Sequence, residues 1–481
     1  MGYCKIYHNS EIDAFFMIFI IWRDATKVGR IQNMNKRIFG ETDGIRAEVG
    51  KKPLRPNMIN NLGKAIAKHF RGGVVLLGRD TRRSGEWMRT EISAGLEACG
   101  VSVENLEVLP TPAVQKIVAM REDANCGIML TASHNPATDN GVKVFAANGD
   151  KLPDEEELEI EEEFFKIDLG EDIDLPAARL KMITREDAID IYAQMVEDEL
   201  GLGDSLRGAK IVLDAASGAG HEFSRAVFEG FGMEVDQIDP EPDGENINDG
   251  YGALYPDRMV AEAKSKGWMG VALDGDADRV IISDEEGRLW DGDRINILLA
   301  TYLHEKGELA QDMVVVTEYS NYATVKYLEA QGIKVEKVVN GDRFVAQKLQ
   351  ELGAKLGSEY SGHIIYLPWL KASDGTFMAL FVQKIMLEKN ARLADLWADF
   401  NFMPSKQWGI KVAEKRPLDK IAGFSEAITE AEVEFAGTGR VFCRYSGTEN
   451  KLRILVEGED MELVEKQGKK LAKIIEKEIG L

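Results

Sequence analysis

One order of elements occurs three times along the chain, and it restricts the fold more than any other feature of the sequence. Each copy has an apolar strand-like run, a loop of small and polar residues, a helical stretch that ends at glycine, and a second strand-like run. The first strand and loop of the copies read GVVLLGRDTRRSG (73–85), KIVLDAASGAG (210–220) and MVVVTEYSN (313–321). A strand, a helix and a strand in succession predict a βαβ unit. We therefore expect an α/β fold with three related mixed-sheet domains, whose ligands bind at the loops that follow the first strands.

The end of the chain follows a different pattern. GRVFCR and LRILVEG are strand-like runs on either side of a turn, and an amphipathic helical pattern, MELVEKQGKKLAKIIEKEI, follows them. This pattern predicts a smaller C-terminal α+β domain, so that four domains surround a central cleft. The predicted domains are residues 34–188, 189–294, 295–402 and 403–481. Residues 1–33 are expected to be an N-terminal extension that is not native or is disordered, because a coherent strand-like pattern starts only after Met34.

Charge and cysteine usage exclude several classes of protein. The formal net charge of −23, from 59 basic and 82 acidic side chains, argues against nucleic acid and anionic membrane surfaces as partners. The apolar run AFFMIFIIW (14–22) is shorter than the roughly 20 residues that a membrane-spanning helix needs. Cys4, Cys99, Cys126 and Cys443 have no metal-binding spacing, which predicts reduced, mostly buried thiols in a cytoplasmic protein.

The stretch LDGDADRVIISDEE (273–286) places carboxylates at alternate positions. Asp274, Asp276 and Asp278 can direct three oxygens toward one hard cation, although a solvated acidic turn is the alternative. An EF-hand is excluded, because Arg279 stands where that loop needs glycine and because the flanking sequences are strand-like. Three carboxylates leave coordination positions for water or phosphate oxygens, which suits Mg²⁺ in phosphoryl transfer.

Three further loops carry polar side chains, and each also fits an ordinary turn. TASHNP (131–136) combines a hydroxyl, an imidazole and an amide, while SEYSGH (358–363) offers a carboxylate, hydroxyls and an imidazole. CRYSGTENKLR (443–453) has hydroxyls, an amide and guanidiniums around a glycine, which are the donors that a phosphate dianion needs. Together with the acidic stretch, one such loop from each of four domains would close a cleft around a phosphorylated sugar.

TASHNP, DGDADR, SEYSGH and RYSGTEN, in this order and spacing, resemble the α-D-phosphohexomutase superfamily from about Arg37 to near the C-terminus. The resemblance implies an intramolecular phosphotransferase of the isomerase class, which moves phosphate between sugar positions through a phosphoserine and a 1,6-bisphosphate. FGETDGIRAEVG, RDTRRSG, LPTPAV, DNGVKVFAANGDKL, EPDGENIND and NGDRFV are more similar to the branch that interconverts glucosamine 6-phosphate and glucosamine 1-phosphate and feeds UDP-N-acetylglucosamine synthesis. The branch that acts on glucose and mannose phosphates by the same mechanism is the alternative.

The resemblance also implies catalytic and metal-binding roles. Ser133 would carry the phosphate, with His134 and Asn135 shaping its loop, and a sugar 1,6-bisphosphate would act as the activator. One Mg²⁺ per subunit would be bound by a phosphoserine oxygen of Ser133 with Asp274, Asp276 and Asp278. The residues implied next to the transferring phosphoryl group or the sugar oxygens are Arg46, Lys143 and Arg279.

Substrate contacts follow from the other two motifs. The residues implied for the sugar hydroxyls are Glu359, Ser361 and His363. The residues implied for the phosphate that is not reacting are Arg444, Ser446, Gly447, Thr448, Asn450 and Arg453. Lys143 and His363 are the candidates for the general acid and base. The partner is then a small phosphosugar, and the protein is expected to be a monomer or a homodimer.

The chain departs from the usual motifs in ways that bear on specificity. EYSGH replaces EQSGH, RYSGTEN replaces RPSGTE, and Ala277 stands where glycine is usual. None of these changes removes a catalytic group, but the first two bear on the preference for the amino sugar. A phosphatase with Asp274 as its nucleophile and a non-catalytic sugar-phosphate sensor are rival hypotheses; the first leaves TASHNP unexplained. The acidic run at 154–163 is interpreted as a solvated helix face, with Leu158 and Phe165 directed inward.

Overall fold

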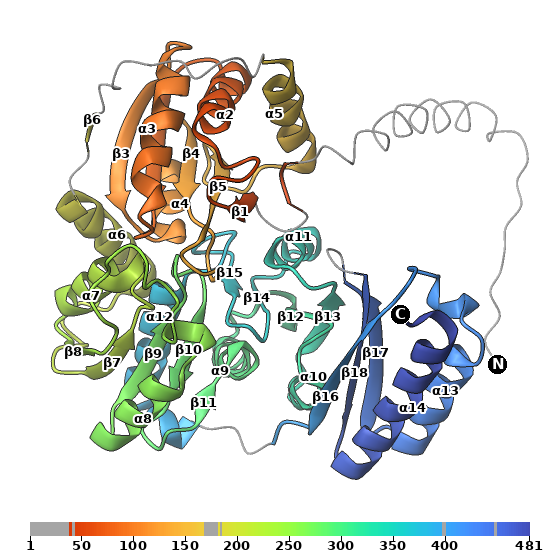
Figure 1. The fold of residues 1–481 in the computed structure, drawn as a ribbon. Helices are drawn as coiled ribbons and strands as arrows, with labels where there is room; N and C mark the ends of the chain where they lie inside the picture. The colour runs from red at the N-terminus through yellow and green to blue at the C-terminus, as the bar shows by residue number, and fades with distance from the viewer. Residues whose placement is uncertain (1–37, 41–43, 168–180, 183–184, 397–400, 447–449) are drawn as a thin grey trace, which may run out of the picture.

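The structure is a computed structural model that describes residues 38–40, 44–167, 181–182, 185–396, 401–446 and 450–481. The described chain forms four sheets, each from its own stretch of sequence. Figure 1 shows the first sheet at the top, the second at the lower left, the third in the middle and the fourth at the lower right. The predicted extension, residues 1–33, lies outside the described residues. In the described part of the chain, no helix is long and apolar enough to cross a membrane.

The first sheet has the strand order β1-β5-β4-β2-β3-β6, in which β5 runs antiparallel to both of its neighbours. Its strands are β1 Ile45–Glu48, β2 Val74–Arg79, β3 Ser102–Val108, β4 Ala124–Leu130, β5 Asp139–Ala146 and β6 Lys181–Met182. Its helices are α2 Pro56–Phe70, α3 Ser84–Glu97, α4 Thr111–Met120, α5 Asp154–Lys166 and α6 Arg185–Leu200. Val75 and Leu77 of β2 pack with α2, α3 and α5, whereas Leu76 packs with α4 and α6. Because both faces are covered, the first four residues of β2, VVLL, form an uninterrupted apolar run.

The second sheet has the order β11-β10-β9-β7-β8. Its strands are β7 Lys210–Asp214, β8 Glu234–Gln237, β9 Met269–Leu273, β10 Val280–Ser283 and β11 Leu289–Trp290, and its own helices are α7 Gly220–Gly230 and α8 Asp257–Lys266. Helix α12 (Gly375–Lys389) follows the third sheet in sequence but packs against β9, β10 and α7 (Figure 1). Ser224 and Thr376 share a hydrogen bond of 2.8 Å, and the Tyr192 hydroxyl donates to Asp374 at 2.8 Å. The second sheet is therefore completed by chain from further along the sequence.

The third and fourth sheets have the orders β13-β12-β14-β15 and β16-β18-β17. The third contains β12 Met313–Thr317, β13 Lys334–Val338, β14 Leu356–Ser358 and β15 Ile364–Tyr366, with helices α9 Gly292–Glu305, α10 Tyr322–Ala330 and α11 Asp342–Leu352. The fourth contains β16 Ser405–Lys411, β17 Gly439–Tyr445 and β18 Lys451–Gly458, with α13 Phe424–Phe435 and α14 Met461–Ile479. The fourth sheet is antiparallel, and one apolar core lies between it and its two helices. Short 3₁₀ turns occupy Gly252–Leu254, Ala310–Asp312, Leu393–Leu396 and Leu418–Lys420.

These sheets confirm the predicted fold class. Each predicted βαβ copy is present, with parallel pairing of β2 and β3, of β7 and β8, and of β12 and β13. The C-terminal hairpin and its helix are also as predicted, whereas β16 and α13 were not foreseen. The domain boundaries at 188, 294 and 402 stay predictions.

The prediction of the inward face of the acidic helix α5 was wrong for Phe165. This side chain is 43% exposed and Leu158 is half-buried, while Ile160 and Phe164 enter the core. Glu161 is buried as well, because its carboxylate accepts the backbone N–H groups of Ile38 and Phe39, each at 2.7 Å. The helix therefore anchors the start of the described chain in addition to presenting a solvated face.

Candidate active site

The serine loop, residues 131–136, follows β4 and holds Ser133 in a strained conformation. Ser133 is buried and has a φ of +51°, a left-handed value that costs an L residue about 1–2 kcal/mol. Its backbone N–H donates to the Thr131 hydroxyl at 2.9 Å. Its carbonyl accepts from the Arg82 guanidinium and from the Asn248 amide, both at 2.9 Å. The surroundings therefore hold the backbone of the serine from several sides.

Arg82 is the main support of the serine loop. Its side chain is fully buried, and its Nε donates to Asp80 at 2.8 Å. Its Nη1 donates to the carbonyls of Pro136 and Asp139, and its Nη2 donates to those of Ser133 and Asn135. One guanidinium thus fixes the whole curvature of the loop.

The acidic loop, residues 274–278, lies against the serine loop. The Ser133 Oγ donates to Asp274 Oδ2 at 2.9 Å, although the two residues follow strands of different sheets, β4 and β9. Gly275 permits this approach, because a Cβ at this position would lie 2.6 Å from the Ser133 carbonyl oxygen. Thr111, the first residue of α4, donates its hydroxyl to Asp276 at 2.6 Å. The first and second sheets therefore meet at the serine hydroxyl.

The three aspartates of the acidic loop could hold a cation. One carboxylate oxygen from each of Asp274, Asp276 and Asp278 lies within 4.8 Å of the others. Lys143 of β5 donates to Asp276 at 2.8 Å and to Asp278 at 3.2 Å. Among the described residues, Asp276 Oδ1 is buried and has no hydrogen-bond partner. Converging carboxylate oxygens with spare acceptor capacity fit a hard divalent cation.

The charges of the acidic loop are unequal. Burial, and then the charges of Asp278 and Asp276, raise the pKa of Asp274 to about 7. Burial also opposes the ionisation of Asp278, but Lys143 and His363 outweigh it and hold the pKa of this carboxyl well below its usual value. Repulsion among buried carboxylates is the expected cost of bringing them close enough to share one cation.

Next to Ser133, the imidazole of His134 is neutral and accepts a hydrogen bond from Arg279. Burial, and then the charges of Arg279 and Arg46, lower the pKa of His134 to about 3. The Arg279 Nη2 donates to His134 Nδ1 at 3.0 Å. His134 Nδ1 also lies 3.3 Å from the Ser133 Oγ. The neutral ring therefore keeps the Arg279 guanidinium next to the serine.

The third-sheet loop, residues 359–363, faces the acidic loop. His363 lies 2.6 Å from Glu359 through Nδ1 and 3.1 Å from Asp278 through Nε2. Burial and Arg279 oppose its protonation, but Asp278 and Glu359 outweigh them and raise the pKa of His363 to about 10. Glu359 also accepts from the Gly341 N–H at 2.8 Å, which attaches the GDR stretch to this loop. His363 is therefore an imidazolium held between two carboxylates.

The C-terminal turn, residues 444–453, joins β17 and β18. Arg444 and Arg453 lie directly opposite each other in the strand register. Ser446 is buried, and its carbonyl accepts from Lys415 at 2.6 Å. Asn450 is exposed, and the predicted Gly447 and Thr448 lie outside the described residues. Like charges opposite each other destabilise a sheet, so this arrangement indicates an anion site.

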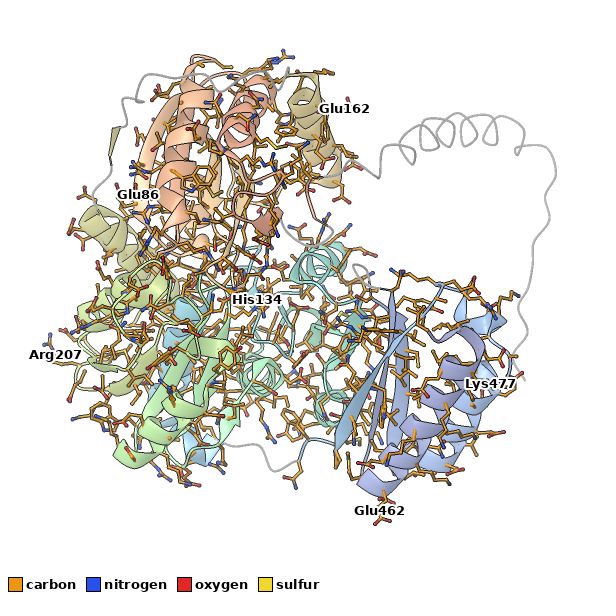
Figure 2. The ribbon with its side chains drawn as sticks, viewed as in Figure 1. Glu86, His134, Glu162, Arg207, Glu462 and Lys477 are labelled. Carbon is orange, nitrogen blue, oxygen red and sulfur yellow. The ribbon has the colours of Figure 1, made fainter. Side chains whose placement is uncertain are left out.

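A cavity of about 640 Å³ brings these groups together from all four sheets. The first sheet contributes Arg46 and His134, and the second contributes Asp278 and Arg279. The third and fourth sheets contribute Glu359, His363, Arg444, Ser446 and Arg453. Figure 2 shows His134 near the centre of the molecule, where the sheets converge. Among the described residues, the predicted site residues that do not line the cavity are Ser133, Lys143, Asp274, Asp276, Ser361 and Asn450.

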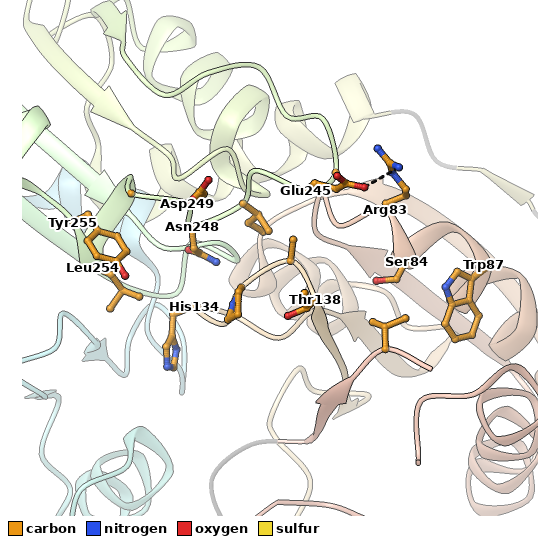
Figure 3. A pocket seen from close by; sticks show the side chains of 16 residues that line it. Arg83, Ser84, Trp87, His134, Thr138, Glu245, Asn248, Asp249, Leu254 and Tyr255 are labelled. Atoms are coloured by element: carbon orange, nitrogen blue, oxygen red, sulfur yellow. Dashed lines mark ion pairs between the residues drawn. The ribbon is translucent and has the colours of Figure 1, made fainter. Parts of the chain in front are cut away.

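A larger hollow of about 830 Å³ lies on the outer side of the serine loop (Figure 3). His134 lines both spaces, while Trp87 and Tyr255 line this one alone. Among its described lining residues, Arg83 is the one arginine or lysine, and it pairs with Glu245 at 2.8 Å. The smaller cavity is lined by four arginines and by Asp278 of the acidic loop. The chemistry for a phosphorylated ligand therefore lies in the smaller space.

Known proteins share this architecture. Family models for phosphoglucomutase/phosphomannomutase α/β/α domain I, α/β/α domain III and C-terminal domain match residues 36–171, 291–401 and 410–474. A phosphoglucosamine mutase of Solidesulfovibrio magneticus is 39% identical over 450 residues, which are 92% of this chain and 99% of that protein. One of Bdellovibrio bacteriovorus is 37% identical over 458 residues, with the same coverage of both chains. The chain belongs to the phosphoglucosamine mutase family.

The fold agrees with this membership. The crystal structure of a phosphoglucomutase/phosphomannomutase family protein from Burkholderia thailandensis superposes with a TM-score of 0.73 at 20% identity, covering 92% of this chain and 99% of that one. The predicted resemblance and the predicted enzyme class, a phosphohexomutase, are thus confirmed. A phosphatase with an aspartyl nucleophile is set aside, as is a non-catalytic sensor.

The three residues that depart from the usual motifs, Ala277, Tyr360 and Tyr445, differ in burial and in whether they line the cavity. Ala277 has a φ of +58°, which explains why glycine is usual there, and its methyl group is buried in the main core. Tyr360 is 48% exposed and does not line the cavity. Tyr445 does line it, and its hydroxyl donates to the Arg416 carbonyl at 2.6 Å. Of the two tyrosines, Tyr445 is the one that can meet the substrate directly.

Several supporting residues of the mutase were missed from the sequence. Arg82 and Asp80 lie in RDTRRSG, and Asn248 lies in EPDGENIND, stretches that were used only to recognise the branch. Thr111 lies in LPTPAV, which was used in the same way. These side chains hold the reacting loops through backbone carbonyls and carboxylates, so composition alone does not reveal them.

Proposed function

We propose that this mutase interconverts glucosamine 6-phosphate and glucosamine 1-phosphate, with Ser133 as the phosphate carrier and a sugar 1,6-bisphosphate as intermediate and activator. Its product would supply UDP-N-acetylglucosamine synthesis. The observation that carries the proposal is the 2.9 Å hydrogen bond between the Ser133 Oγ and Asp274, beside a cavity whose other wall holds Arg444 and Arg453. The identity to curated phosphoglucosamine mutases supports the choice of sugar.

Asp274, Asp276 and Asp278 would hold one Mg²⁺ together with an oxygen of the phosphorylated Ser133. The converging oxygens and the unpartnered Asp276 Oδ1 support this donor set. When bound, the ion would neutralise charge on the transferring phosphoryl group. Lys143 would hold the carboxylates of Asp276 and Asp278 in place.

In the first transfer, the P–O bond to Ser133 breaks while a hydroxyl oxygen of the monophosphate forms a new P–O bond. In the net exchange, the proton that the sugar hydroxyl gives up is the one that the Ser133 Oγ gains, so the Ser133 side chain returns to a free hydroxyl. Arg46 and Arg279, which line the cavity, would stabilise the phosphoryl charge, and Arg444, Ser446 and Arg453 would hold the other phosphate. The bisphosphate then presents its other end, and the same steps run in reverse onto Ser133.

Lys143 and His363 were the candidates for acid–base catalysis. Lys143 donates to two carboxylates, and His363 has a raised pKa, so both groups are cationic in the resting site. Neither can accept a proton in that state. We assign them charge stabilisation and, for His363, proton donation, with Glu359 as the acceptor that orients its ring.

Turnover by the purified chain tests the proposal. Glucosamine 6-phosphate, glucose 1-phosphate and mannose 1-phosphate are compared by kcat/KM, each with its 1,6-bisphosphate. We expect the amino sugar to be preferred, and a stronger preference for either hexose phosphate would overturn the choice of substrate. Ser133→Ala should lower kcat by about 10³-fold or more and remove the phosphorylated fraction from the intact mass, whereas Ser102→Ala, an exposed serine of the same sheet, should change neither.

Full activity of Ser133→Ala would refute the phosphoserine mechanism. The cytoplasmic location and the state of monomer or homodimer stay predictions.

A further inference from the structure

Tyr319 lies in the loop of the third βαβ copy, between β12 and α10. The corresponding loops of the other two copies carry RDTRRSG and AASGAG, and no aromatic residue stands in either. Tyr319 is half-buried and does not line the central cavity. The mechanism proposed above assigns no role to Tyr319.

The ring of Tyr319 is built against the strand that carries Arg444. The Arg444 Nε donates to the Tyr319 hydroxyl at 3.0 Å, and the guanidinium carbon lies 5.0 Å from the ring centroid. Phe442, two residues earlier on β17, meets the same ring edge-on, with 5.5 Å between centroids. One side chain of the third sheet therefore contacts the end of a strand in the fourth.

These contacts determine how Arg444 can meet an anion. The Nε–H of Arg444 is already hydrogen-bonded to the Tyr319 hydroxyl. The terminal nitrogens of Arg444 have no hydrogen bond to any part of the chain that the structure describes. A guanidinium held by Nε presents its terminal nitrogens as a pair, which is the geometry for bidentate binding of phosphate oxygens. The π face and the hydroxyl also offset the repulsion between Arg444 and Arg453 across the strands.

Tyr319 also contacts the third-sheet loop. Its ring lies 6.4 Å from that of Tyr360, at an angle of 34°. Tyr360 is adjacent to Glu359, which lines the cavity and binds His363. Tyr319 thus lies between the loop next to the sugar end of the cavity and the turn at its phosphate end.

We infer that Tyr319 is a positioning residue that holds Arg444 ready for the phosphate of the substrate and connects the third-sheet loop to the C-terminal turn. The inference rests on the proposed role of Arg444 in phosphate binding. Because an arginine held in place loses less side-chain freedom on binding, the contact increases affinity for the phosphate end without taking part in the transfer.

Tyr319→Phe removes the hydroxyl and keeps the ring. We expect KM for the monophosphate to rise about five- to tenfold, since a hydrogen bond to a charged group is lost at a half-exposed site, while kcat changes less than about twofold. Tyr322→Phe is the matched control, because this tyrosine is three residues away and lies 5.9 Å from a different arginine, Arg440, which does not line the cavity. Its KM should equal that of the parent.

Calorimetric titration with glucose 1,6-bisphosphate measures the same effect without turnover. The Kd should rise about five- to tenfold in Tyr319→Phe and further in Tyr319→Leu, which also removes the aromatic ring. A chain that binds the bisphosphate but does not convert glucosamine phosphates would refute the proposed substrate and leave this inference standing. An unchanged Kd in both Tyr319 variants overturns the inference, as does an equal rise in Tyr322→Phe.

Discussion

Replacing Arg82 by lysine should displace the serine loop while leaving the fold in place. Arg82 is fully buried, and all five of its N–H donors are used, one on Asp80 and four on backbone carbonyls. A lysine ammonium has the same charge but only three donors and no planar fork. At least two of the five acceptors therefore lose their partner.

The magnitude follows from which acceptors have a second donor. The carbonyls of Ser133 and Asn135 keep the Asn248 amide, at 2.9 and 3.2 Å, and that of Pro136 keeps the Asp139 N–H at 3.0 Å. Among the described residues, the Asp139 carbonyl has Arg82 as its one donor. An unpaired buried polar group costs about 1–3 kcal/mol and a further lost hydrogen bond about 0.5–1.5 kcal/mol, so we expect the first sheet to lose about 2–4 kcal/mol. The melting temperature of its transition should fall by roughly 5–15 °C. A shift of about 1 Å in Ser133 should lower kcat by roughly 10²-fold.

Scanning calorimetry, kcat at saturating substrate and the phosphorylated fraction of Ser133 check the three effects. Arg83→Lys is the matched control, because Arg83 is the next residue, its side chain is 70% exposed, and its ion pair with Glu245 is on the surface. That variant should stay within about 0.5 kcal/mol of the parent. If Arg82→Lys keeps kcat within about threefold of the parent, the serine loop does not depend on the guanidinium, and the reasoning is refuted.

Two further perturbations test the metal site and a buried histidine. Asp276→Asn should lower Mg²⁺-dependent turnover by about 10³-fold or more while the protein stays folded, and activity that persists in a chelator would contradict the assignment of the acidic loop. In the second sheet, burial opposes protonation of His221, but Asp239, 2.7 Å away, outweighs it and raises the pKa of the imidazole. Stabilisation by this pair is then complete below pH 6.5 and is lost as the pH rises through the raised pKa. The difference in melting temperature between the parent and His221→Gln should therefore narrow as the pH rises above 6.5. A difference that does not vary with pH would refute the charged pair.

The fold could be predicted where local pattern and burial agree. In the βαβ copies, strands such as β2 begin with a continuous apolar run because both faces are covered, and each helix ends near a glycine. Strand β16 escaped prediction because its side chains are mostly exposed or half-buried, so it lacks an apolar signal. Helix α12 is apolar all round because it packs into the second sheet. Its own residues do not indicate which sheet it packs against.

The sequence by itself determined which chemistry is available: a serine in a polar loop, a trio of carboxylates, and a turn rich in donors, each after a strand. These depend on residue type and spacing, which local sequence carries. Only the tertiary structure decided that Ser133 and Asp274, which lie 141 positions apart, share a hydrogen bond, and that Arg82, Asn248 and Tyr319 hold the reacting groups from outside the motifs. Such contacts join backbone carbonyls or side chains of separate sheets, so they exist only once the sheets are packed against one another.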